Sequence, residues 1–125
     1  MFKSIETTED IQDFLDATNM MHDGHIIGVQ YTNSGITRKG NRIHYHPEQT
    51  KLTLQILVTS LFDTTVEIEF EHLFEWQIKD STYIYGTCVD IQGWIVWSSE
   101  IYANTDELKR NSYVIAESMK WRIVK

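Results

Sequence analysis

Apolar residues near the start of the chain recur at helical spacing. Ile11 and Phe14 begin a stripe at i, i+3, i+4 and i+7, and acidic residues occupy the opposite side. Thr7 or Thr8 can accept a hydrogen bond from the free backbone amides of a first helical turn. We therefore expect a helix over residues 8–20, apolar on one face and acidic on the other.

Beyond residue 24 the apolar period changes from 3.6 to 2, which is typical of strands. Residues 25–32, 52–59 and 66–71 alternate apolar and polar side chains. A short turn joins the last two segments, so they predict an antiparallel hairpin with one buried and one wet face. A final strand is expected over 113–123.

Two further segments, 83–91 and 94–99, are apolar on both faces and flank a Gln92-Gly93 turn. This pattern predicts a hairpin of central strands that are covered on two sides. The alternation that starts at Val66 continues to Ile78, about twice the usual strand length. We expect a bulge or bend near Glu71–Leu73 that splits it into two strands.

The polar segment between Gly35 and Pro47 leaves two structures open. Gly40-Asn41 can close a hairpin between 36–39 and 42–46, or the whole segment can be an irregular loop.

Together these elements predict one α+β domain over residues 1–125. An N-terminal helix would pack on a strongly twisted antiparallel sheet or half-barrel of about six to seven strands. The only cysteine is Cys88, so no intramolecular disulfide can form, which favours a reducing compartment. The chain has neither a long apolar run nor a start like a signal peptide, so we expect a cytoplasmic protein without a membrane partner.

Net charge is −7 and is unevenly distributed. Residues 36–51 carry a local excess of +3, so the rest of the chain carries −10. Such a chain repels phosphates and anionic lipids, so nucleic acids and membranes are disfavoured as partners and a basic protein is favoured. Stability alone gives no reason to group like charges on one strand face. The candidate binding residues are therefore the acidic side chains of that predicted face and of the predicted helix, namely Glu67, Glu69, Glu71, Asp13 and Asp16.

Four of the five histidines fall within 25 residues: His22, His25, His44 and His46. Neutral imidazoles form the ligand set for zinc or iron, and two histidines two apart share one face of a strand. The alternative function is therefore a metal-binding protein or metal-dependent enzyme. No acidic ligand follows at a telling distance, so we interpret the histidines as surface or hydrogen-bonded residues and expect no metal or cofactor.

Catalytic motifs are missing from the sequence. Cys88 falls in the middle of a predicted strand, where a buried, inert thiol is the common outcome. There is no Gly-x-Ser-x-Gly elbow, Gly-rich phosphate loop or dinucleotide fingerprint, which disfavours an enzyme. A third interpretation is a small-ligand-binding β-barrel lined by the aromatic residues, including Trp76, Trp94, Trp97 and Trp121.

Two short stretches carry a resemblance to known proteins. The segments His22–Ile27, placed after an N-terminal helix, and Phe74–Ile78, placed after alternating strands, resemble small uncharacterised bacterial single-domain proteins of helix-plus-antiparallel-sheet build. Some proteins of this build resemble toxin-immunity proteins, which neutralise a toxin by binding it. The resemblance implies a non-enzymatic binding module, such as an inhibitor of a basic protein partner, and implies no catalytic residues.

Overall fold

A computed structural model describes residues 1–46, 49–79 and 83–124. The helices are α1 (Thr8–Ala17) and α2 (Thr105–Leu108), with short 3-10 turns at Asn19–Met21 and Thr59–Leu61. The strands are β1 (Lys3–Ser4), β2 (Gly24–Asn33), β3 (Ile36–Lys39), β4 (Arg42–Tyr45), β5 (Thr50–Val58), β6 (Thr64–Gln77), β7 (Thr87–Ile91), β8 (Trp94–Ser98) and β9 (Tyr113–Val124).

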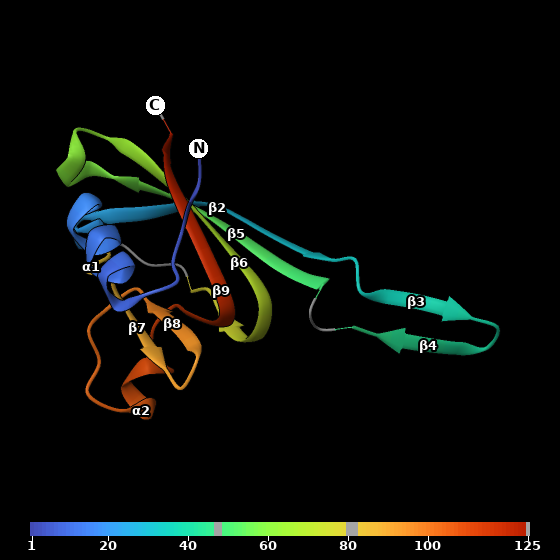
Figure 1. Ribbon diagram of the computed structural model, residues 1–125. Helices are drawn as coiled ribbons and strands as arrows, with labels where there is room; N and C mark the ends of the chain where they lie inside the picture. The colour runs from blue at the N-terminus through green and yellow to red at the C-terminus, as the bar shows by residue number, and fades with distance from the viewer. Residues whose placement is uncertain (47–48, 80–82, 125) are drawn as a thin grey trace.

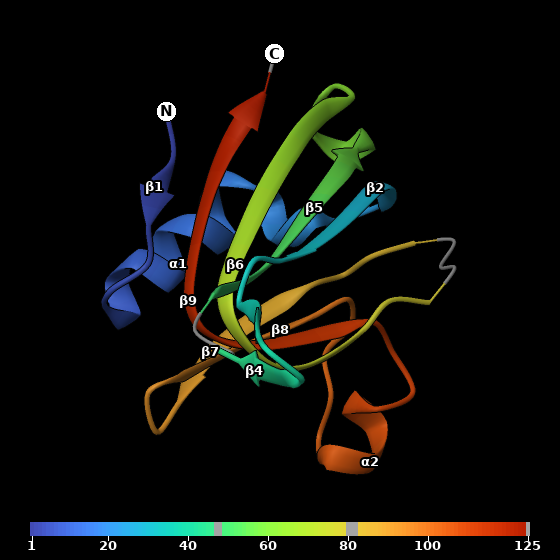
Figure 2. The ribbon, with the colours of Figure 1, turned by 90° about the vertical axis from the view of Figure 1, so that its right-hand side faces the viewer.

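Seven of the described strands form one curved antiparallel sheet in the order β2-β5-β6-β9-β8-β7, with β1 paired to β9 (Figure 1). Helix α1 covers one face of this sheet, which confirms the predicted α+β class (Figure 2). The sheet does not close on itself. The expected hairpins β5–β6 and β7–β8 both form, but β7 lies at an edge of the sheet and not at its centre.

Helix α1 begins with the cap that the sequence predicts. Thr7 accepts a hydrogen bond from the Asp10 amide, and the Asp10 carboxylate accepts one from the Thr7 amide, which together form a capping box. The helix ends at Ala17, three residues earlier than expected, and the backbone takes left-handed φ angles from Asn19 to Met21. Neither described helix is long and apolar enough to cross a bilayer.

The core lies between α1 and the concave face of the sheet. Phe14 of α1 meets Trp121 of β9 edge to face, with ring centroids 5.4 Å apart. Trp97 is fully buried, and its Nε1 donates to the sulfur of Met21. The concave face is therefore filled with side chains, and the open sheet does not form the ligand-binding barrel that the aromatic content suggested.

Strand β6 contains the predicted irregularity. His72 has a left-handed φ of 56°, and the pairing with β9 shifts by one residue between Leu73 and Glu75. Phe70 is consequently buried, whereas Phe74 is 68% exposed. The bulge is confirmed, but the expected split is wrong, because β6 continues through it as one strand.

Candidate functional site

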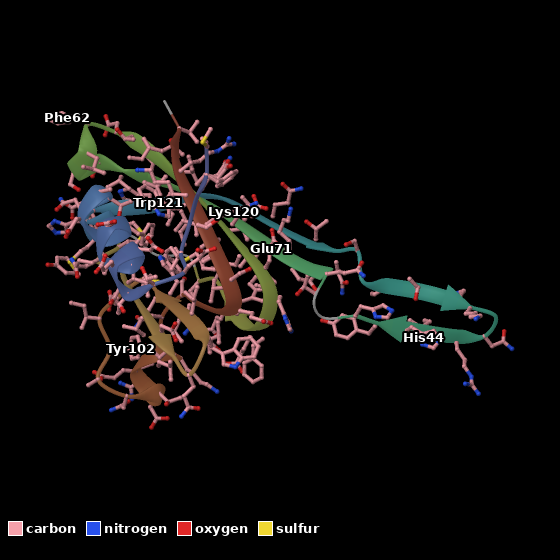
Figure 3. All side chains as sticks on the ribbon, viewed as in Figure 1. His44, Phe62, Glu71, Tyr102, Lys120 and Trp121 are labelled. Atoms are coloured by element: carbon pink, nitrogen blue, oxygen red, sulfur yellow. The ribbon has the colours of Figure 1, made fainter. Side chains whose placement is uncertain are left out.

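The predicted row of Glu67, Glu69 and Glu71 lies on the convex face of β6, and cations flank it on both sides. The β9 register places Arg122 opposite Glu67 and Lys120 opposite Glu69. Figure 3 shows Lys120 and Glu71 on this part of the sheet. The neighbouring strand β5 contributes Lys51, Thr53 and Gln55.

The distances show that these charges are paired. Arg122 Nη2 lies 2.8 Å from the Glu67 carboxylate, and Lys51 Nζ lies 2.9 Å from the Glu69 carboxylate. Lys120 lies between Glu69 and Glu71, at 3.7 and 3.8 Å. The pKa of Lys51 is raised, first by the hydrogen bond between Lys51 and Glu69 and then by the charge of the Glu69 carboxylate.

Three carboxylates are thus balanced by three cations, and Glu67 and Glu69 are only 12% exposed. The expectation that stability gives no reason to group them is wrong, because each acidic side chain has a cross-strand partner. A signal was present in the sequence: Lys120 and Arg122 alternate with the same period as the glutamates.

Asp13 and Asp16 lie away from the glutamate row. They line a groove of about 400 Å³ between α1 and β1, together with Lys3, Asp10 and Trp121. Helix α1 packs on the face that bears Trp121, whereas the glutamates project from the opposite face. The structure therefore does not combine the five predicted acidic residues into one site.

The four candidate histidines do not converge either. His22 and His25 lie at the N-terminal end of β2, where each packs against a tyrosine ring at 4.9 and 5.5 Å between centroids. His44 lies on β4, beyond the other end of β2 (Figure 3). At about 3.3 Å per residue, the part of β2 from His25 to Asn33 alone spans roughly 26 Å. Within the described residues, no three His, Cys, Asp or Glu side chains gather closely enough to hold a metal ion.

The segment that the sequence left open is a projecting hairpin, which we call the arm and define as residues 36–45. It extends beyond the end of the β2–β5 pair and points away from the body of the molecule (Figure 1). The turn is Gly40-Asn41, where Gly40 takes a φ of +64°. Every residue of β3 and β4 is exposed, so both faces of the arm are accessible to solvent.

The two faces of the arm differ in chemistry. The register pairs Ile36 with Tyr45 and Arg38 with Ile43, so these four side chains share one face. The other face carries only polar and cationic side chains, from Thr37, Lys39, Arg42 and His44. The apolar face is well exposed, with Ile36 at 56%, Ile43 at 60% and Tyr45 at 55%. An isolated two-stranded ribbon of this kind is marginally stable in water.

Strand β2 leads into the arm and, like the arm, carries exposed apolar side chains. Ile27, Val29 and Tyr31 are each 44% exposed or more. Apart from a single bridge between Gly24 and Ile84, no described strand pairs with the outer side of β2. We call β2 together with the arm the edge–arm surface. The sequence pattern predicted the strand but gave no information on its place at the edge.

A second apolar surface lies on the convex side of β8, beside α2. It is an open pocket of about 340 Å³ whose lining includes Phe74, Trp94, Tyr102 and Leu108. The rings of Phe74 and Trp94 lie 5.4 Å apart between centroids. No charged side chain lines this pocket among the described residues, so nothing in it fixes the orientation of a polar ligand.

Comparisons with protein-family models, curated proteins and solved structures give no match for this chain.

Proposed function

We propose that the protein is a non-enzymatic binding module that binds a protein partner through its edge–arm surface. The observation that carries this proposal is the series of exposed apolar side chains along β2 and the arm. Their positions are Ile27, Val29 and Tyr31 on β2, followed by Ile36, Ile43 and Tyr45 on the arm. Contiguous apolar surface on a projecting element is typical of protein-interaction sites.

The edge of β2 supports a protein partner over a small molecule. Backbone donors and acceptors at a sheet edge are satisfied by an added strand, which only a polypeptide supplies. The arm is an open ribbon and offers no enclosed volume. We place the protein in the cytoplasm, and the free, buried Cys88 supports a reducing compartment.

The burial of Cys88 disfavours one catalytic route, nucleophilic attack by its thiol. Burial raises the pKa of its thiol to about 12, so at neutral pH it is protonated and a poor nucleophile.

The immunity-like alternative, inhibition of a basic protein, is supported by a different place on the molecule. The groove beside α1 combines the carboxylates of Asp13 and Asp16 with the ring of Trp121. A basic side chain of a partner would meet these carboxylates there, although the buried Trp121 ring already lies 5.4 Å from the ammonium of Lys3. Under this alternative, Asp13→Asn/Asp16→Asn would abolish partner binding, whereas Glu71→Gln, a loss of charge on the compensated row, would leave it unchanged.

A photo-cross-linking experiment tests the edge–arm proposal. The photoreactive residue benzoylphenylalanine replaces Tyr31, Tyr45 or, as the control, Ile101, which is 64% exposed outside this surface. In living cells, positions 31 and 45 should each cross-link to protein, and position 101 should not. Cross-linking at position 101 alone, or at none of the three, would contradict the proposal.

A further inference from the structure

The two edges of the sheet are built differently. Strand β7 is five residues long and carries Asp90. Strand β2 is ten residues long and contains no Asp, Glu, Lys, Arg or Pro. Proteins usually protect a long edge with charge, proline or a covering segment, because unpaired backbone groups invite another strand. The β2 edge therefore has the character of a strand-pairing interface.

An uncharged edge of this kind is self-complementary. Two copies of β2 can pair antiparallel about a twofold axis, with no like charges placed opposite one another. The pairing would also shield Ile27, Val29 and Tyr31 from water, at least in part. A second copy thus meets the chemical requirements of the edge.

The direction of the arm extends this argument. The arm projects past the C-terminal end of β2 (Figure 1). In an antiparallel pair, that end lies beside the N-terminal end of the partner's β2. Each arm would therefore reach the region of the other copy from which its β2 starts.

The surface at the N-terminal end of β2 suits the arm in charge and in polarity. Asp23 precedes β2, and Asp63 lies in the turn before β6, next to Phe62, which is 99% exposed. Thr59 and Ser60 donate hydrogen bonds to the carbonyls of Asp23 and the residue before it, which joins these two segments. His22 lies 3.7 Å from the Asp23 carboxylate and packs on Tyr85, so this surface combines acidic, imidazole and aromatic side chains.

The arm carries the opposite charge. Its three cations are Arg38, Lys39 and Arg42, and it has no carboxylate, so the remainder of the −7 chain carries −10. An arm is therefore attracted to the body of a second copy, whereas two arms repel each other. This charge distribution favours an arm-on-body contact over arm-on-arm packing.

We propose that two copies of this chain form a dimer by antiparallel pairing of their β2 edges, with each arm lying over the N-terminal end of the other copy's β2. The inference rests on the proposed edge–arm function and names its partner.

Sedimentation velocity on the purified full chain tests the dimer, with two matched lysine variants. Val29→Lys places a charge on the β2 edge, and Val89→Lys makes the same change on β7, at the other edge. Val29→Lys should raise the dimer dissociation constant by about tenfold or more, and Val89→Lys should leave it unchanged. Circular dichroism checks that both variants fold.

A second variant tests the arm separately. Arg38→Glu/Arg42→Glu reverses two charges on exposed side chains of the arm, so the body should stay folded. It should weaken the dimer, and added salt should weaken the unmodified dimer more than this variant. In a Cys88→Ser background, single-cysteine variants along β2 should form an intermolecular disulfide on oxidation only beside the twofold axis, whereas Asp90→Cys should form none.

Three results would overturn the dimer. They are a monomer at all concentrations, a dimer that Val29→Lys does not weaken, or open-ended oligomers. The proposed function fails differently, through the absence of cross-links at positions 31 and 45. A monomer that still cross-links at both positions in cells would show that the edge–arm surface binds a different protein.

Discussion

Arg122 donates a hydrogen bond through Nε to one carboxylate oxygen of Glu67 at 3.0 Å, and its Nη2 forms an ion pair with the same oxygen at 2.8 Å. The second oxygen of that carboxylate accepts a hydrogen bond from Gln55 Nε2 at 3.0 Å. Glu67 thereby links three neighbouring strands, β5, β6 and β9. Its role on the convex face is to hold the sheet together, and its charge is already compensated.

Glu67→Gln should accordingly lower the free energy of unfolding by about 1 kcal/mol, because Arg122 loses its charged partner. The matched control is Glu71→Gln. Glu71 is 46% exposed, and its carboxylate lies 3.8 Å from Lys120 Nζ. The free energy of unfolding should therefore change little in Glu71→Gln. Chemical denaturation of both variants measures the difference. A Glu67→Gln variant as stable as the unmodified protein would show that the pair is only incidental.

The fold was largely predictable because its signals are local. The Thr7 cap, the alternation in β5 and the Gln92-Gly93 turn each depend on residues close together in the sequence. The partners of the glutamates were not predictable in this way. Arg122 is 55 residues from Glu67, and their contact depends on β6 and β9 being neighbours in a particular register.

The sequence also did not indicate the place of each strand in the sheet. The predicted segment 83–91 was interpreted as apolar on both faces, as central strands are, yet its C-terminal part, β7, lies at an edge. Strand β2 alternates as a half-buried strand does, yet Val29 and Tyr31 remain exposed beside the buried Leu54 and Leu52. Edge position decides their exposure, and only the tertiary pairing sets it.

Thr7→Ala should destabilise the protein by about 1 kcal/mol, because the Asp10 amide loses the hydroxyl that caps it. Thr8→Ala is the control, since Thr8 is exposed and lies within the first turn of α1. Thermal unfolding followed by circular dichroism distinguishes the two. Equal effects of both substitutions would mean that the capping hydroxyl adds nothing to stability.

The stability of the folded protein should depend on pH through the Asp10 carboxylate. Its pKa is held below the ordinary value of 3.8, mainly because it accepts a hydrogen bond from the Glu6 amide. A carboxyl group with a lowered pKa in the folded state stabilises above its unfolded pKa, and this contribution is lost as the pH falls through its folded pKa. Asp10→Asn should therefore be less stable than the unmodified protein at pH 7 and approach it in strong acid. A stability gap independent of pH would contradict this assignment.

Cys88 should be unreactive in the folded protein. Burial raises the pKa of its thiol to about 12, so no thiolate is available to an alkylating reagent at pH 8. Iodoacetamide should modify it only after denaturant is added, as mass spectrometry would show. A raised thiol pKa stabilises the fold below the unfolded value of 9.0, and this contribution is lost as the pH rises towards 12. Modification of the folded protein at pH 8 would place Cys88 outside the core.

Removal of the arm should leave the body intact. Gly35 and His46 already close the ribbon, because the His46 amide donates to the Gly35 carbonyl at 2.7 Å. Replacing residues 36–45 with Asn-Gly would therefore keep this closure and remove only exposed side chains. The free energy of unfolding should change by less than about 0.5 kcal/mol, as for other exposed sites.

Leu54→Ala checks that the same unfolding assay detects a core defect. Leu54 is fully buried, so this substitution should cost about 2–5 kcal/mol. If removal of the arm costs as much as Leu54→Ala, the arm packs on its own body and is not presented to a partner. If the arm is dispensable for stability, its three cations and its apolar face have no role within the monomer. The arm-deleted protein should then show the same weakened association as Arg38→Glu/Arg42→Glu.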